Sequence, residues 1–124
     1  MTFDADLGGA HVLMSTRGET GDNRGPSPMD LVLAALGGCT AMDIVTVLRK
    51  KRQPFTGLTV RLRGERADCH PYRYTKIEMV YEVRGEGVDL AAVERAVELS
   101  DQKYCSVSAT LREHTEITSR IELV

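Results

Sequence analysis

An almost unbroken run of apolar residues at positions 31–48 predicts one long helix. Ser27 is a suitable N-cap, and Pro28 fits the first helical position, where no backbone N–H is needed. Basic residues at 49–52 suit the negative end of the helix dipole, and Pro54 ends the helix. Because apolar side chains cover nearly every side of this helix, we expect it to be buried all round.

Alternation with a period of two predicts strands in the second half of the chain. Strands are expected at residues 11–14, 58–63, 77–84 and 117–123. A second helix is expected to begin after Asp89 and to reach Tyr104, and a third short helix is expected near Ser106. Antiparallel strands with segregated helices indicate an α+β fold. One small sheet covers one side of a helix, so a second copy of the chain is expected to cover the other.

Composition narrows the class of protein. A chain of 124 residues with 42% hydrophobic and 27% charged residues suits one globular domain over residues 1–124. The net charge of −2 argues against a nucleic-acid partner. Polar and glycine residues such as Gly37 and Asp43 interrupt the apolar run, and the first residues do not resemble a secretory signal, so neither a membrane span nor secretion is expected.

The three cysteines are odd in number and widely spaced, unlike the framework of a secreted disulfide protein. A reducing cytoplasm is therefore expected, where a cysteine is a candidate reactive group. Cys69 is interpreted as an exposed loop thiol. No cysteine or histidine follows a metal-binding spacing, so we expect neither a metal nor a cofactor.

Cys39 is either a buried structural thiol or a reactive one. The preceding Gly37 and Gly38 each cost about 1 kcal/mol within a helix. They suggest either a close approach by another segment or a local loosening that brings free N–H groups to Cys39. Asp43, four residues further on, shares the helix face of Cys39 and would raise its pKa, so it is expected to pair with a basic group or to reach the surface.

Cys105 is likewise either structural or reactive. It lies where the second helix is expected to end and the third to begin. Free N–H groups at that junction and the neighbouring Lys103 would both lower the pKa of its thiol. The neighbouring Tyr104 and Val107 suit a half-buried structural cysteine, so both interpretations stay open, with a lowered thiol pKa expected from this junction.

Three segments together resemble the OsmC/Ohr superfamily of hydroperoxide reductases. They are Ser27 to Cys39, the following Thr40 to Lys50, and the distant Lys103 to Val107, which contains Lys-Tyr-Cys-Ser. The resemblance implies an OsmC-like fold: antiparallel sheets around a long central apolar helix, in an intertwined homodimer. It further implies that Cys39 attacks the peroxide, that Cys105 resolves the sulfenic acid as a disulfide, and that a dithiol reductant restores the enzyme.

Two departures from the superfamily pattern affect the expected activity. The peroxide reductases place a Glu directly after the motif Pro, where this chain has Met29. They also use an Arg from the N-terminal region, for which Arg17 or Arg24 are the candidates here. We expect a thiol-dependent peroxidase that reduces organic hydroperoxides in oxidative-stress defence. The alternative is a non-catalytic dimeric module that binds a small hydrophobic ligand or senses redox state.

Overall fold

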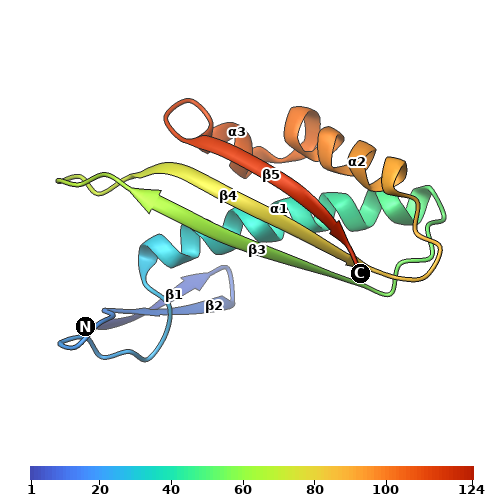
Figure 1. Cartoon of the computed structure of the whole chain (residues 1–124). Coiled ribbons are helices and arrows are strands. Elements are labelled where there is room, and N and C mark those ends of the chain that lie inside the picture. The colour runs from blue at the N-terminus through green and yellow to red at the C-terminus, as the bar shows by residue number, and fades with distance from the viewer. The chain divides into compact units, whose positions relative to one another are not determined.

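The computed structural model describes all 124 residues and has an α+β architecture with two sheets and one long helix (Figure 1). The chain divides into two compact units, residues 1–34 and 35–124. Helix α1 (Pro28–Lys50) begins in the first unit and continues through the second. The predicted long helix and fold class are confirmed, whereas one domain over 1–124 stays a prediction.

The first unit contains a β-hairpin, of which the sequence pattern indicated one strand only. Strand β1 (Thr2–Leu7) pairs antiparallel with β2 (Ala10–Ser15). Gly8 and Gly9 connect them with φ values of 65° and 95°, the left-handed conformations that a tight two-residue hairpin turn requires. The Gly-Gly dipeptide was therefore the signal for the missed strand β1.

Helix α1 begins with a reciprocal capping arrangement. The Asp30 backbone N–H donates to Ser27 Oγ at 3.0 Å, and the Ser27 N–H donates to the Asp30 carboxylate at 2.9 Å. Each hydrogen bond satisfies a backbone donor that the first helical turn leaves free. The predicted N-terminus of α1 is thus confirmed.

The second unit is built on a three-stranded sheet in the order β3–β4–β5. Its strands are β3 (Gly57–Arg66), β4 (Tyr74–Arg84) and β5 (Glu116–Leu123). Strand β3 is antiparallel to β4, as predicted, but β5 is parallel to β4, so the expectation of antiparallel pairing throughout was wrong. The segment between β4 and β5 is helical, and such a crossover returns the chain to the start of β4 before β5 begins.

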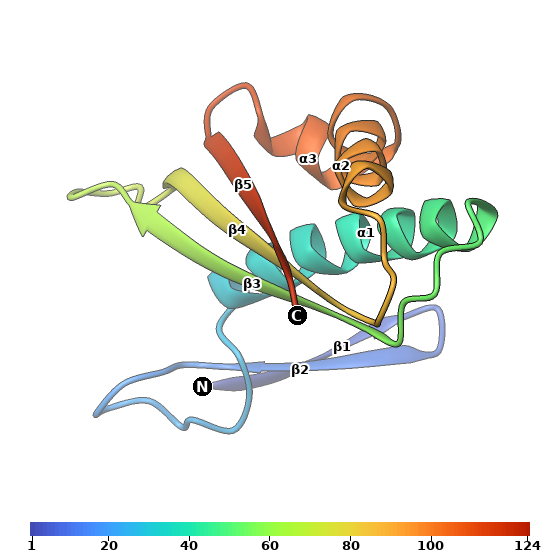
Figure 2. The same cartoon turned by 45° about the vertical axis from the view of Figure 1, so that its right-hand side comes forward.

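All three helices of the second unit lie on one face of this sheet (Figures 1 and 2). Central strand β4 supplies that face with alternate buried side chains, and the opposite face carries the exposed Arg61–Glu82 and Arg61–Glu122 ion pairs. The predicted division into a core face and a solvent face is confirmed. The fully buried large hydrophobic residues of the unit are Leu36, Ile44, Leu48, Ile77, Val83 and Val93.

The segment after β4 contains α2 (Leu90–Leu99), a π-helical turn η1 (Ser100–Tyr104) and α3 (Ser106–Leu111). Asp89 caps α2 as predicted, because its carboxylate accepts from the Ala91 N–H at 3.1 Å. The predicted second helix does reach Tyr104, but its last turn is widened into η1. Such π-helical turns occur frequently at functional sites.

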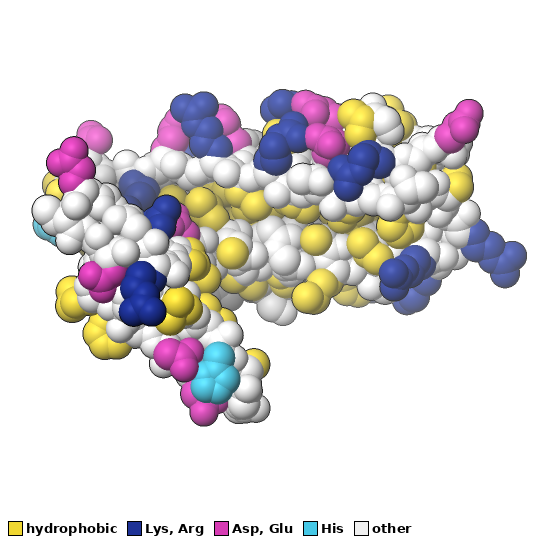
Figure 3. Space-filling view, turned by 90° about the horizontal axis from the view of Figure 1, so that it is seen from below, with side chains coloured by type: hydrophobic (Ala, Val, Ile, Leu, Met, Phe, Trp, Pro, Cys, Tyr) yellow, Lys and Arg dark blue, Asp and Glu magenta, His cyan; other side chains and the backbone are white.

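One side of α1 stays uncovered by its own chain. By length and hydropathy this helix could cross a membrane, and only 33% of its most apolar stretch is buried. Met42 is 74% exposed, and Figure 3 shows hydrophobic side chains gathered along the surface seen from below. The core helices of soluble proteins share this composition. The expected burial of α1 on all sides is therefore not achieved within one chain.

Candidate functional site

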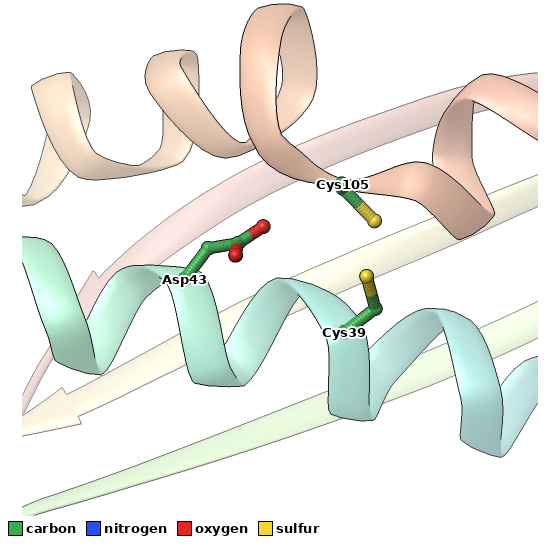
Figure 4. A group of neighbouring side chains, drawn as sticks. All are labelled: Cys39, Asp43 and Cys105. Carbon is green, nitrogen blue, oxygen red and sulfur yellow. The ribbon is translucent and has the colours of Figure 1, made fainter.

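Two cysteines and a carboxylate meet between α1 and the junction of η1 with α3. The sulfur atoms of Cys39 and Cys105 and a carboxylate oxygen of Asp43 all lie within 4.8 Å of one another. Figure 4 shows the two sulfur atoms pointing toward each other, with Asp43 one helical turn along α1 from Cys39. Residues four apart on a helix share a face, which explains how α1 supplies two members of the cluster.

Local backbone geometry holds Cys105 in this cluster. The chain leaves η1 at Cys105 in an extended conformation, and the Cys105 N–H donates to the Ser100 carbonyl at 2.8 Å. Its sulfur then caps α3 by accepting from the Ser108 N–H at 3.3 Å. The predicted helix junction is confirmed, and it leaves Cys105 only 4% exposed, whereas Cys39 is half-buried.

Asp43 is held by a serine and forms no ion pair. Ser100 Oγ donates to its carboxylate at 2.9 Å, and Ser100 itself is 1% exposed. Of the two expectations for Asp43, the basic partner is wrong, because Ser100 takes that position. The carboxylate is partly exposed, as the alternative expected, and lies beside the two sulfurs. Neither Ser100 nor Ser108 was identified from the sequence, since a serine in a helical pattern gives no sign of what its side chain or N–H contacts.

The pKa of the Cys105 thiol is raised to about 11. Burial is the largest cause, and the neighbouring Cys39 and Asp43 raise the pKa further. The Ser108 N–H lowers it, as expected for a helix junction, but burial outweighs that hydrogen bond. The predicted acidified thiol was therefore wrong for Cys105. Lys103 does not reverse this balance, since its amino group lies over the Tyr104 ring, 5.3 Å from the centroid.

Helix α1 is continuous through its two glycines, so the loosening considered for Cys39 does not occur. The close approach does occur, although a side chain makes it. A Cβ atom on Gly37 would lie 2.7 Å from Leu62 Cδ1 of β3, whereas one on Gly38 would meet nothing within 4 Å. Gly37 thus lets α1 approach the sheet just before Cys39.

Tyr81 forms part of the buried layer beneath the site. Burial raises the pKa of its hydroxyl to about 12, a hydrogen bond with Thr40 lowers it, and the charges of Cys105 and Asp43 add to the increase. The hydroxyl also donates to the Met79 sulfur at 3.6 Å. Tyr81 is therefore a neutral, hydrogen-bonded group at physiological pH.

Two cavities are each lined by one member of the cluster. One of about 340 Å³ is lined by Asp43, Val47, Leu99 and Tyr104 and by Lys50 and Lys51 of the helix end. The other, about 270 Å³, is lined by Cys105 together with residues of η1 and α3, including Arg112. Small molecules therefore have room next to both the carboxylate and the second sulfur.

The remaining candidate residues are Cys69 and three residues of the first unit. Cys69 is exposed in the connection between β3 and β4, as predicted. Met29, Arg17 and Arg24 belong to the first unit, where the Arg17 guanidinium donates to the Gly25 carbonyl at 3.5 Å. The structure brings together Cys39 and Cys105, the two cysteines that the resemblance pairs, and adds Asp43 to them.

The fold and the site define an α+β protein with two neighbouring thiols, a half-buried one on a long apolar helix and a buried one at a helix junction. Comparison with known proteins gives the family. The OsmC-like protein model matches residues 21–120, so the chain belongs to the OsmC-like protein family.

The chain is also similar to individual proteins. The chain is 40% identical to Protein YhfA of Escherichia coli K12 over 124 residues, covering 100% of this chain and 91% of that protein. A hypothetical protein from Aquifex aeolicus VF5 has a similar crystal structure, with 34% identity, a TM-score of 0.81, and 99% and 89% of the two chains covered. An OsmC-like protein from Mycoplasma pneumoniae shares the fold at 15% identity, with a TM-score of 0.85 and the same coverage.

Proposed function

We propose that the protein is a thiol-dependent peroxidase that reduces organic hydroperoxides through Cys39 and Cys105, in defence against oxidative stress. One observation carries this proposal. The two sulfur atoms lie within 4.8 Å of each other, although 66 positions separate the residues in the chain. A disulfide needs a sulfur separation of about 2.05 Å, so the two side chains must rotate toward each other to close the bond.

The chemistry proceeds in two steps. The Cys39 thiolate attacks one peroxide oxygen, an S–O bond forms, the O–O bond breaks, and the alkoxide leaves as an alcohol after taking a proton. Cys105 then attacks the Cys39 sulfur, an S–S bond forms, and the hydroxyl group leaves as water. A dithiol reductant returns both cysteines to thiols by exchange. Such a cycle fits a reducing compartment, and we propose the cytoplasm.

The surroundings of the two sulfurs support this division of roles. Cys39 is half-buried, whereas Cys105 is 4% exposed, so Cys39 is the sulfur that a peroxide reaches more easily. Val47 and Leu99 line the cavity at Asp43, and their apolar side chains favour an alkyl hydroperoxide over hydrogen peroxide.

Mass spectrometry after mild oxidation tests the proposal. Treatment of the reduced protein with about one equivalent of cumene hydroperoxide per chain is expected to form a Cys39–Cys105 disulfide quickly, and dithiothreitol is expected to reverse it. The Cys69→Ser variant serves as the matched control and should form the same disulfide. Slow, unselective oxidation of all three cysteines would instead support the non-catalytic binding module, which the replacement of the family Glu by Met29 favours.

We also propose that the protein is a homodimer in which a second copy covers the exposed side of α1. The uncovered hydrophobic surface includes Met42, Val45, Phe55 and Leu58, which line a shallow hollow beside α1. Burying such a surface provides the main driving force for association.

A charge placed on this surface is expected to prevent dimerisation. Met42→Glu should elute as a monomer in light-scattering chromatography, because association would bury an unpaired carboxylate. Ala91→Glu, on the exposed side of α2, is the control and should stay dimeric. A wild-type protein that is monomeric at micromolar concentration would contradict the proposal.

A further inference from the structure

We propose that the reduced site binds a thiophilic divalent cation, with Zn²⁺ as the preferred ion, through Cys39 Sγ, Cys105 Sγ and the Asp43 carboxylate. This binding goes beyond peroxide reduction and requires no peroxide. No metal-binding spacing is visible in the sequence, because two ligands come from one turn of α1 and the third lies 62 positions after Asp43. Only the fold brings the three donors together.

The donor set fits zinc in both type and geometry. Zinc binds thiolate sulfur at about 2.3 Å and carboxylate oxygen at about 2.0–2.2 Å in a tetrahedral arrangement. Donors around one such ion lie roughly 3.5–3.8 Å apart, and the three donors here are already within 4.8 Å of one another (Figure 4). Two thiolates also select against Mg²⁺ and Ca²⁺, which prefer oxygen ligands.

The charge of the site favours a cation. No Lys or Arg side chain forms an ion pair with Asp43. The nearby positive groups contact other residues: Lys103 lies over the Tyr104 ring, and Arg112 forms an ion pair with Asp101. Lys50 and Lys51 line the cavity at Asp43 but form no ion pair with its carboxylate. Binding would release the two thiol protons to solvent and place the 2+ ion among three anionic donors.

Hydrogen bonds from outside the cluster already orient two of the three ligands. Ser100 Oγ donates to the Asp43 carboxylate at 2.9 Å, and the Ser108 N–H donates to Cys105 Sγ at 3.3 Å. Outer hydrogen bonds of this kind fix metal ligands in place and commonly change metal affinity by about 10–100-fold. Both donors are compatible with an anionic ligand, because one donates a hydrogen bond to the Asp43 carboxylate and the other donates one to the Cys105 sulfur.

The ion would have an entry path and an open coordination position. Three protein ligands leave the fourth tetrahedral position for water or another small ligand. The cavities of about 340 Å³ at Asp43 and about 270 Å³ at Cys105 both reach the cluster and provide that space.

Oxidation would release the ion. When an organic hydroperoxide oxidises the two thiolates to a disulfide, it takes up two electrons and two protons and leaves as an alcohol and water. The new S–S bond removes two of the three ligands, so the metal dissociates. The reduced, metal-bound form and the oxidised, metal-free form would then be alternative states of one site.

Metal titration of the reduced, metal-free protein tests the inference. Zn²⁺ is added in competition with a chromophoric chelator, and Co²⁺ in a parallel titration reports thiolate ligation through its sulfur-to-cobalt charge-transfer absorption. The wild type and the Cys69→Ser control are each expected to bind one ion per chain with that absorption. Cys39→Ser and Cys105→Ser should lose the absorption, and Asp43→Asn should weaken zinc binding at least about tenfold.

Several outcomes would overturn the inference. They are the absence of binding by the folded wild type, unchanged binding in Cys39→Ser and Cys105→Ser, or loss of binding in Cys69→Ser alone. Circular dichroism of each variant verifies that it is folded. Peroxide turnover without metal binding would refute the metal site and leave the proposed function standing. Metal binding without turnover would refute the proposed function and leave the metal site standing.

Discussion

Replacing Cys39 with serine is expected to reduce cumene hydroperoxide turnover to the uncatalysed background. The serine hydroxyl does not ionise at neutral pH, and the S–O bond of the first step requires sulfur as the nucleophile. Cys105→Ser should behave differently. Its Cys39 can still react once, so this variant is expected to consume one equivalent of peroxide and then stop as a sulfenic acid, which dimedone labels.

A matched control separates these losses from unfolding. Cys69→Ser removes the exposed third thiol and is expected to retain wild-type turnover, measured with excess dithiothreitol as the reductant. Equal turnover in the wild type and all three serine variants would mean that the activity belongs to no cysteine of this chain, and the proposed function would then be wrong.

Replacing Ile44 with alanine is expected to lower the free energy of unfolding by about 2–5 kcal/mol. Ile44 is 0% exposed and lies on the side of α1 that packs under the sheet, so its truncation leaves a cavity that the surrounding elements fill only in part. Typical domains are stable by about 5–15 kcal/mol, which makes this loss a large fraction of the total.

Urea denaturation at a fixed protein concentration measures the effect of Ile44→Ala, because association would couple stability to concentration. Glu94→Ala on the exposed side of α2 is the control and should change the unfolding free energy by less than about 0.5 kcal/mol. A loss below about 1 kcal/mol in Ile44→Ala would contradict the assignment of this side of α1 to the core.

The elements with strong periodic patterns were predictable from the sequence. The capping residues Ser27 and Asp89 and the alternation in β4 each rest on local chemistry, and all three predictions are confirmed. Strand β1 was missed although Phe3, Ala5 and Leu7 alternate with polar residues and the following Gly-Gly dipeptide suits a hairpin turn. The parallel pairing of β5 was also missed, because strand direction depends on how the intervening helices return the chain and not on the strand itself.

The candidate site was predictable only in part. The two cysteines were identified from motifs, but their electrostatic environment depends on burial, which a local sequence does not show. The pKa of Cys105 was expected to be lowered but is raised, because burial outweighs the hydrogen bond from the Ser108 N–H. Asp43 was recognised as sharing a helix face with Cys39, yet its partner Ser100 comes from a segment that only the folded chain places beside it.

The length of the widened turn η1 determines the direction in which the Cys105 side chain points. An ordinary α-helix advances by about 100° per residue, so shortening Ser100–Tyr104 by one residue would swing the next side chain far around the helix axis. The sulfur at position 105 would then face away from α1, although neither cysteine had been changed. The length of this five-residue segment is therefore as much a determinant of the thiol pair as the cysteines are.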